Sequence, residues 1–309
     1  MSGTAPSPAT TAAPSPAGRS VTVIGLGPMG QAMAGAFLDR GYEVTLWNRT
    51  PSRADGLVAR GATLATSVEE ALRANELVVL SLIDYATMHT VLGQAEDALS
   101  GRVVVNLSSD TPRKTEEGAR WVTERGAAFL AGGVTSPPSG IGDPASYTFY
   151  SGPSEPLERH RATLETLTQV EYLGEDPSRA ALMYQIGMTM FWTSLLSYWQ
   201  AIALANAHGL KAADILSHAV TTMSANREFF GFYADRIDAG NHAGDVDRLA
   251  MGTASAEHVL HTMEDSGVDT TLPKAVLELF ERGMASGRAA ESVSSLVEEI
   301  RAQGAGRSA

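Results

Sequence analysis

A glycine-rich turn near the start of the chain constrains the fold more than any other feature. The sequence Gly25-Leu26-Gly27-Pro28-Met29-Gly30 follows an apolar, β-branched run at residues 20–24 and opens a helical pattern that is closed by Gly41. Glycines at this spacing allow a tight bend, close backbone approach to a pyrophosphate, and close packing of a helix on a strand. A strand, this turn and a helix together predict a dinucleotide-binding site at the start of a Rossmann fold.

The alternation of strand-like and helical segments continues through the first half of the chain. Further strands are expected at residues 43–47, 62–65, 77–83, 103–107, 128–131, 147–151 and 170–173. Because these strands are apolar throughout, they predict an α/β fold with a mainly parallel sheet that is covered on both faces.

After residue 176 the strand signals stop. Helices are expected at residues 179–207, 212–223, 227–237, 246–264, 273–284 and 290–302. We therefore predict a cofactor-binding Rossmann domain at 19–175 and an all-helical substrate and dimerisation domain at 176–309, which begins with a long interdomain helix at 178–208. Residues 1–18 are uncharged and rich in Ala, Pro, Ser and Thr, and are expected to form a disordered tail.

Composition excludes several classes of partner. A formal charge of −12 in 309 residues, without a basic cluster, argues against a nucleic acid or an anionic membrane. The absence of cysteine excludes disulfides and thiolate chemistry and, together with the lack of a recognisable signal peptide, predicts a cytoplasmic protein. Residues 180–207 carry no charge and are long enough to span a bilayer, but polar residues such as Gln185 and Gln200 interrupt them, which favours a core or dimer helix.

The end of the second expected strand bears on which dinucleotide binds. NAD-binding turns have an acidic residue about 20 positions after the glycines, which contacts the ribose 2′-hydroxyl. This chain instead has Asn48-Arg49-Thr50-Pro51-Ser52-Arg53, with two guanidiniums that suit a 2′-phosphate. The sequence therefore predicts NADPH as cofactor; the alternative is that Arg49 and Arg53 are ordinary surface charges.

Residues after the fourth and fifth strands are expected to frame the nicotinamide from the carboxyl edge of the sheet. They are Leu82, Ile83, Asn106, Ser108 and Ser109. Each could instead serve only the structure of its loop.

Two groups of residues resemble known families. Residues 23–30, taken with Trp47-Asn48-Arg49-Thr50, resemble the β-hydroxyacid dehydrogenase superfamily, in which a Rossmann domain is joined to an all-helical domain. Within it, residues 106–112, Gly132-Gly133-Val134 and residues 172–192 are similar to the NADPH-dependent imine reductases. This resemblance implies a domain-swapped homodimer with a shared active site, which reduces C=N bonds.

The absence of a lysine separates the two families. Hydroxyacid dehydrogenases of this superfamily use a lysine on the interdomain helix as general acid and base, but no lysine lies between Lys114 and Lys211. Oxidation of a hydroxyacid requires removal of an alcohol proton and a cation for the carboxylate, whereas an iminium carbon is already electrophilic. The missing lysine therefore favours reduction of an imine.

The resemblance assigns Tyr184 to the position where imine reductases carry Asp or Tyr, the proposed proton donor. A tyrosine hydroxyl is protonated at neutral pH and can donate a hydrogen bond to nitrogen. The alternatives are that Tyr184 only positions the substrate, or that it is an amphipathic core residue.

Further residues are candidates for lining an apolar substrate site, although most of them could equally be core. They are Ser109, Thr111, Val134, Met183, Gly187, Met188, Phe191, Trp192, Phe229, Phe230 and Tyr233. His258 and His261 share a helix face, but no carboxylate completes a ligand set, so no metal is expected.

Our hypothesis is hydride transfer from NADPH to a prochiral, cyclic imine, with a ketone and an amine as possible joint substrates. Two rivals remain. One is a hydroxyacid dehydrogenase with displaced catalytic residues, and the other is a non-catalytic regulator that senses NADPH.

Overall fold

The computed structural model describes residues 19–305, with side chains described through residue 302. The tail expected at residues 1–18 lies outside this range. Contacts divide the chain into two units, one ending at Thr189 and the other beginning at Met190. The two units are described separately below.

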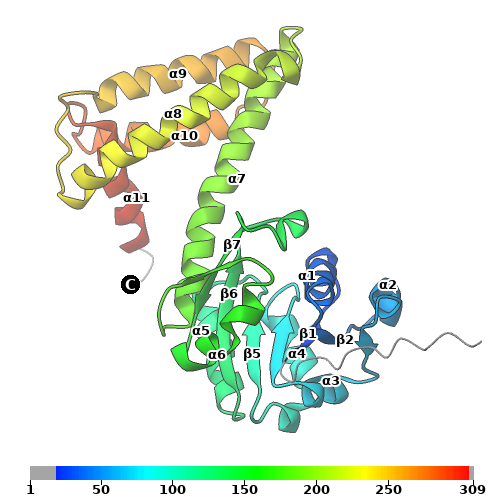
Figure 1. The fold of residues 1–309 in the computed structure, drawn as a ribbon. Coiled ribbons are helices and arrows are strands. Elements are labelled where there is room, and N and C mark those ends of the chain that lie inside the picture. The colour runs from blue at the N-terminus through cyan, green and yellow to red at the C-terminus, as the bar shows by residue number, and fades with distance from the viewer. Residues whose placement is uncertain (1–18, 306–309) are drawn as a thin grey trace, which may run out of the picture. The chain divides into compact units, whose positions relative to one another are not determined.

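The first unit is built on an eight-stranded sheet with the order β3-β2-β1-β4-β5-β6-β7-β8 (Figure 1). The strands are β1 Ser20–Ile24, β2 Glu43–Trp47, β3 Thr63–Leu64, β4 Leu77–Leu80, β5 Val103–Asn106, β6 Ala128–Val134, β7 Tyr147–Ser151 and β8 Gln169–Tyr172. All neighbours run parallel except β6 and β7. The mainly parallel sheet is confirmed, and its strand order reverses between β1 and β4, where nucleotides bind in folds of this type.

Helices cover both faces of this sheet. They are α1 Pro28–Asp39, α2 Asp55–Val58, α3 Val68–Ala74, α4 Tyr85–Leu92, α5 Pro112–Thr123 and α6 Ser154–Leu164. Val23 of β1 packs in one core cluster with residues of α1 and α6, whereas the adjacent Ile24 packs in the other with residues of α3, α4 and α5. Because successive side chains of each strand enter different cores, the strands are apolar throughout.

Two strands differ in length from the expectation. β4 ends at Leu80 rather than at residue 83, because the backbone N–H of Leu82 donates to the Ser108 hydroxyl instead of to a neighbouring strand (3.0 Å). β6 continues to Val134, past residue 131, because the antiparallel β7 pairs with its last residues, as in Gly133 with Phe149.

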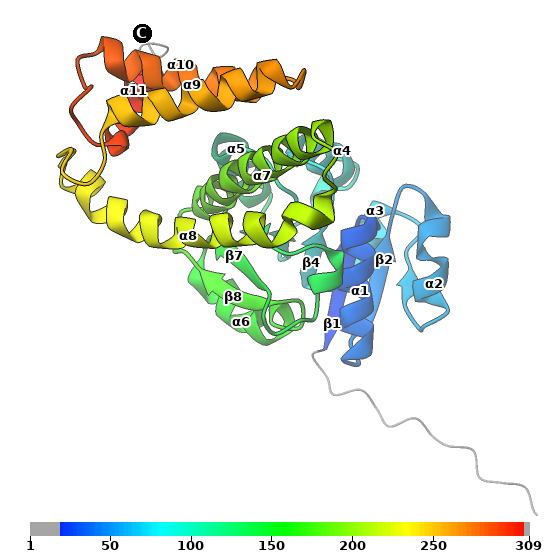
Figure 2. The same ribbon diagram turned by 90° about the horizontal axis from the view of Figure 1, so that it is seen from above.

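The second unit is all-helical, as expected. It contains the second half of α7 Ser178–Ala207 together with α8 Ala212–Asp238, α9 Leu249–Asp265, α10 Thr271–Ala285 and α11 Leu296–Ala305. The predicted break between residues 223 and 227 is wrong, because α8 runs through it as one helix (Figure 2). The modest helix propensities of Ser224 and Asn226 cost too little to interrupt a helix of 27 residues. None of the described helices is both long and apolar enough to cross a membrane.

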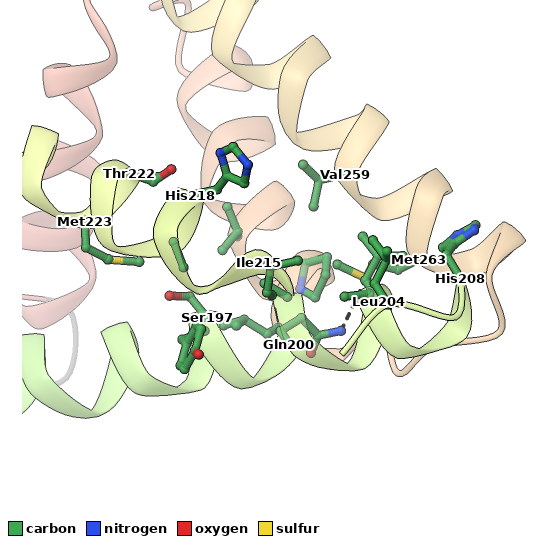
Figure 3. Close-up of a pocket in the computed structure, with 18 of the residues that line it drawn as sticks. Ser197, Gln200, Leu204, His208, Ile215, His218, Thr222, Met223, Val259 and Met263 are labelled. Atoms are coloured by element: carbon green, nitrogen blue, oxygen red, sulfur yellow. Dashed lines mark hydrogen bonds between the residues drawn. The ribbon is translucent and has the colours of Figure 1, made fainter. Parts of the chain in front are cut away.

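An apolar cavity of about 730 Å³ opens within the helical unit. Its lining comes from α7, α8, α9 and α10, with Leu204, Ile215, Val259 and Met263 among the side chains that face it (Figure 3). At one end, the Gln200 amide donates to the Asp269 carbonyl (2.6 Å). The described residues leave this apolar surface of the four helices unfilled.

Candidate cofactor and substrate site

The three glycines of the turn meet three different constraints. Gly25 has φ +96°, and a β-carbon there would lie 2.2 Å from the Ser81 carbonyl oxygen. A β-carbon on Gly30 would lie 1.9 Å from the Gly25 carbonyl oxygen, so α1 could not pack as closely. A β-carbon on Gly27 would meet nothing within 4 Å, which leaves its backbone open to a ligand at the N-terminus of α1. The turn therefore has the bend, the packing and the open approach that a pyrophosphate requires.

A cavity of about 540 Å³ lies against this turn. Among the predicted cofactor residues, those that line it are Gly25, Leu26, Gly27, Pro28, Met29, Asn48, Arg49, Thr50, Arg53, Leu82 and Ile83. Gly30, Asn106, Ser108 and Ser109 are not among the lining residues. The structure thus brings the turn, the end of β2 and the end of β4 around one pocket.

Asn48 ties two parts of this pocket together. Its side-chain carbonyl accepts from the Leu26 N–H in the glycine-rich turn (2.9 Å), and its amide donates to the Thr50 carbonyl (2.8 Å). Since both ends of the side chain are engaged, Asn48 holds the turn against the loop that follows β2. The second N–H of the amide has no partner among the described residues, and direct contact of Asn48 with the cofactor stays a prediction.

Arg49 and Arg53 are exposed at the rim of the same pocket. Within residues 19–302, neither guanidinium forms an ion pair with a carboxylate. Two guanidiniums without anionic partners suit a dianionic 2′-phosphate better than a ribose hydroxyl.

Asn106 and Ser108 brace the strand ends from inside. Asn106 is fully buried; its side-chain carbonyl accepts from the Ser108 N–H (2.9 Å), and its amide contacts the Met88 sulfur (3.3 Å). The Ser108 hydroxyl in turn accepts from the Leu82 N–H, whereas the neighbouring Ser109 is exposed. Of these three residues, Ser109 is the one whose side chain is free to meet a ligand, and direct cofactor contact by any of them stays a prediction.

Tyr184 lies directly against β6. A β-carbon on Gly133 would lie 2.8 Å from Tyr184 Cβ and 3.1 Å from the Ala180 carbonyl oxygen. One turn earlier in α7, the Ala180 N–H donates to the buried Ser151 hydroxyl (3.0 Å), which itself donates to the Pro177 carbonyl (2.9 Å). The first turns of α7 are thereby fixed on the sheet. The Tyr184 hydroxyl has no hydrogen-bond partner among the described residues, so it is available to a ligand.

The other predicted substrate residues are divided between the two units. In the first unit, Val134 is partly buried beside Gly133, and Met188 is partly buried one turn after Tyr184. The exposed ones in this unit are Ser109, Thr111, Met183 and Gly187. In the second unit, Phe191, Trp192, Phe229 and Phe230 are each about half exposed. These aromatic side chains are accessible for a ligand or a partner.

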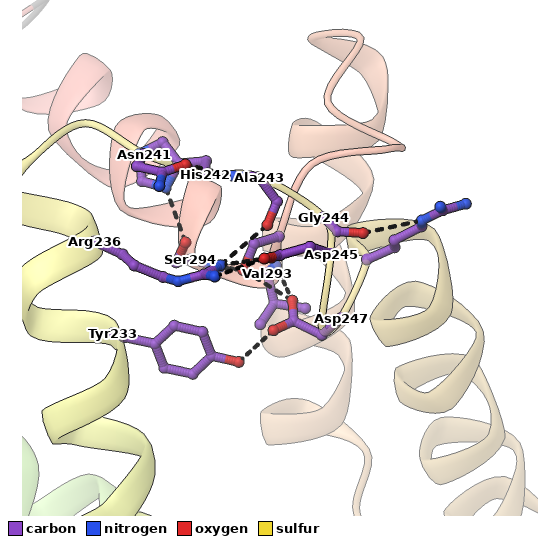
Figure 4. A network of polar contacts seen from close by, with 12 residues as sticks. Tyr233, Arg236, Asn241, His242, Ala243, Gly244, Asp245, Asp247, Val293 and Ser294 are labelled. Carbon is purple, nitrogen blue, oxygen red and sulfur yellow. Dashed lines mark hydrogen bonds and ion pairs between the residues drawn. The ribbon is translucent and has the colours of Figure 1, made fainter.

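Tyr233 is already engaged in the helical unit. Its hydroxyl donates to the Asp247 carboxylate (2.6 Å), which also accepts from the Ser292 hydroxyl (2.9 Å) and the Val293 N–H (2.7 Å) (Figure 4). Burial, and then the hydrogen bond to Asp247, raise the pKa of Tyr233 to about 12. The hydroxyl therefore stays protonated and fastens the loop between α8 and α9, so any contact with substrate would come from the ring.

Four residues line the cofactor pocket without having been predicted. They are Trp47, Ser81, Thr87 and Val91. Thr87 and Val91 lie one turn apart on α4, and Asp84 caps this helix by accepting from the Thr87 N–H (2.7 Å). The sequence signal that could have identified them is this Asp-x-x-Thr cap directly after the fourth strand.

Two family models match successive parts of the chain. Residues 20–174 match the NAD binding domain of 6-phosphogluconate dehydrogenase, and residues 176–302 match the C-terminal domain of the NADPH-dependent reductive aminase-like family. The NADPH-dependent reductive aminase of Aspergillus oryzae is 29% identical over 284 residues, which cover 91% of this chain and 96% of that protein.

Two solved structures share the fold at nearly full length. An imine reductase of Streptomyces aurantiacus is 63% identical, with a TM-score of 0.89, and the match covers 91% of this chain and 99% of that one. A reductive aminase of Aspergillus terreus in complex with NADPH4, cyclohexanone and allyl amine is 29% identical, with a TM-score of 0.88 and the same coverage.

Proposed function

The chain belongs to the family of NADPH-dependent imine reductases and reductive aminases, and we propose that it reduces a prochiral imine beside Tyr184. It is an NADPH-dependent oxidoreductase. The observation that carries the proposed site is the Tyr184 hydroxyl, which has no partner among the described residues and stands on a helix segment fixed to the sheet. We propose both a cyclic imine and a ketone with an amine as substrates, because a solved relative holds cyclohexanone and allyl amine.

The described residues fit NADPH in the first unit. The pyrophosphate would lie over Gly27 at the N-terminus of α1, and Arg49 and Arg53 would hold the 2′-phosphate. When bound, NADPH supplies the hydride that the reaction transfers. Asn48 would keep the two phosphate-binding segments at a fixed separation, since it bonds to both.

Tyr184 would act on the nitrogen end of the substrate. A phenol donates one hydrogen bond, so its O–H would orient the imine nitrogen or a water that protonates it as hydride reaches the carbon. Val134 and Met188 would supply apolar walls on either side of it. This assignment needs no metal and no lysine, in agreement with the residues present on this part of α7.

The experiment is to mix the protein with NADPH and a panel of cyclic imines and to follow the loss of nicotinamide absorbance. We expect Tyr184→Phe to lower kcat by about tenfold to a hundredfold, because one proton-donating group is lost, while NADPH affinity is unchanged. Tyr147→Phe, at an exposed position on β7, is the matched control and should keep the wild-type rate. An unchanged kcat in Tyr184→Phe would remove Tyr184 from the chemistry. Turnover of hydroxyacids without turnover of imines would reject the proposed function itself.

We also propose a domain-swapped homodimer in which a partner helps to enclose the site. The support is the apolar surface that α7 and α8 leave exposed. It includes Leu182, Ile186, Phe191, Trp192, Leu196, Trp199, Leu216, Val220, Phe229 and Phe230. Light scattering of the full chain tests this proposal, and a monomer at micromolar concentration would contradict it.

Two further proposals concern organisation and location. We propose that the functional division lies near residue 175, with residues 19–175 for the cofactor and 176–309 for substrate and dimerisation, which limited proteolysis tests. We propose a cytoplasmic location because the chain has no cysteine. Cell fractionation tests this location.

A further inference from the structure

A single hydrogen bond connects the two segments that carry Tyr184 and Ser109. The Gln185 side-chain amide on α7 donates to the Asp110 backbone carbonyl after β5 (3.1 Å). Tyr184 and Ser109 are the immediate chain neighbours of its two ends. We propose that Gln185 is a positioning residue for imine reduction, which sets the direction in which Tyr184 faces the nicotinamide edge. This inference rests on the proposed role of Tyr184.

The Asp110 end of the bond is held in place by its own side chain. One carboxylate oxygen accepts from the Thr111 N–H (2.8 Å), and the other accepts from the Tyr85 N–H at the start of α4 (3.4 Å). Lys114 lies 3.4 Å from the same carboxylate, which is only 11% exposed. The Asp110 carbonyl is therefore held in one position as the acceptor for the Gln185 amide.

The α7 end is held on the sheet by two contacts, and the Gln185 bond adds a third in another direction around the helix. The Ser151 hydroxyl holds the Ala180 N–H, and Gly133 sets how closely the helix approaches β6. Both contacts lie on one face of α7, because Ala180 and Tyr184 are four residues apart. In an α-helix consecutive residues point about 100° apart. A contact made by Gln185 therefore fixes the rotation about this axis, and with it the direction of the adjacent Tyr184 side chain.

Rotation of α7 would affect catalysis more than stability. A donor that is displaced by about 1 Å from its productive position can lower a rate by about a hundredfold. The loss of one partly buried amide hydrogen bond has only a small effect on folding. Loss of the Gln185 contact should therefore separate these two quantities, whereas a merely structural contact would change stability alone.

The test compares Gln185→Met with Gln169→Met. Both substitutions keep an unbranched side chain and remove an amide that donates to a backbone carbonyl, at Asp110 in the first case and at Pro144 in the second. Gln169 lies on β8, and neither Gln169 nor its partner Pro144 is a chain neighbour of Tyr184 or Ser109. For each variant we would measure kcat, NADPH affinity, the melting temperature and the enantiomeric excess of the amine from a prochiral cyclic imine.

We expect Gln185→Met to lower kcat about tenfold or more and to reduce the enantiomeric excess, because a Tyr184 that points in several directions allows the imine to bind in more than one orientation. NADPH affinity should stay within about twofold, and Gln169→Met should match the wild type in rate and selectivity. Gln185→Glu keeps the shape of the side chain but its carboxylate cannot donate, so it should show the same losses of kcat and enantiomeric excess. It replaces Gln185→Met in the test if that variant folds poorly.

Wild-type rate and selectivity in both Gln185 variants would overturn the inference, as would an equal loss in Gln169→Met. Failure of the proposed function is recognised separately, since the wild-type protein would then not oxidise NADPH with any imine. If Tyr184→Phe is inactive but Gln185→Met is normal, Tyr184 acts without this positioning contact.

Discussion

Gly133 of β6 and Tyr184 of α7 are packed so closely that no side chain fits between them. The β-carbon of any other residue at position 133 would lie 2.8 Å from Tyr184 Cβ, inside the closest approach that two such atoms tolerate. Because Tyr184 Cβ is attached to the helix backbone, it cannot rotate away. The position of Tyr184 above the sheet thus depends on the absence of a side chain on the strand below.

Gly133→Ala should therefore destabilise the protein and impair catalysis together. Overpacking of this kind costs about 1 to 3 kcal/mol, and α7 must shift to relieve it. Chemical denaturation and steady-state kinetics measure the two effects. Gly56→Ala is the control, since a β-carbon there meets nothing within 4 Å on the helix α2, and it should be neutral or slightly stabilising. Wild-type kinetics in Gly133→Ala would mean that the position of Tyr184 does not matter.

Two substitutions of Asn48 should differ in how they change the affinities for NADPH and NADH. Asn48→Ala removes the contacts with both Leu26 and Thr50, so we expect NADPH and NADH to bind more weakly by a similar factor, about tenfold for a loss near 1.4 kcal/mol. Asn48→Asp keeps the acceptor for Leu26 but loses the donor to Thr50 and adds a negative charge, so NADPH should lose more affinity than NADH. Fluorescence titration with each cofactor measures this. Equal losses in Asn48→Asp would contradict a 2′-phosphate at this loop.

Removal of the Ser151 hydroxyl should loosen the start of α7. Ser151→Ala leaves the Ala180 N–H and the Pro177 carbonyl without their partner at a fully buried position. We expect a loss of about 1 to 3 kcal/mol in the free energy of unfolding, measured by urea denaturation. Ser139→Ala, at an exposed position, is the control and should change little. A stability for Ser151→Ala equal to that of the control would show that water replaces the hydroxyl.

The ion pair at the end of α8 predicts a pH dependence for the helical unit. Arg236 donates two hydrogen bonds to Asp245 (2.7 and 2.8 Å), and these lower the pKa of the Asp245 carboxyl to about 2 (Figure 4). Since the folded-state pKa lies below the unfolded value near 3.9, the stabilisation is complete above about pH 4. It is lost as the pH falls through 2.

Arg236→Gln should accordingly unfold at lower urea than the wild type at neutral pH, and the difference should shrink between about pH 4 and pH 2. Arg73→Gln, which breaks an exposed pair with Glu69, should show little difference at any pH. A difference in urea midpoint between Arg236→Gln and the wild type that does not change with pH would assign the effect to the other contacts of Arg236, with the Ala243 carbonyl and the Phe232 ring.

The local sequence pattern was sufficient to predict the Rossmann fold and the glycine-rich turn. Gly25 and Gly30 are constrained by atoms that lie close along the chain or on the adjacent strand, and the spacing of such glycines is visible in the sequence. The two hydrogen bonds of Asn48 could not be predicted from the sequence. Its partner Leu26 lies 22 residues away, and the pairing of β1 with β2 brings the two together. The sequence predicts that Asn48 contacts the cofactor, which stays a prediction, and the structure adds that Asn48 holds the turn against the loop after β2.

The misjudged break in α8 and the hydrogen bond of Tyr233 each have their own cause. Residues 224–226 have weak helix propensity, but α8 continues because the helix on either side outweighs them. Tyr233 was predicted to line a substrate site from its place on this helix. Its hydroxyl is held by Asp247, 14 residues further on, across a loop whose conformation no local pattern specifies.

The reversal of β7 determines where α7 can lead. With β7 antiparallel to β6 and β8 parallel to β7, the chain leaves the sheet at the edge opposite the one where β1, β4 and β5 end. α7 must then travel back along β6, past Gly133, and Gln185 reaches Asp110 just after the end of β5. If β7 and β8 ran parallel to β6, α7 would start at the edge where β1, β4 and β5 end and would run away from it. One antiparallel pairing thus sends α7 back toward the edge of the sheet where β5 ends.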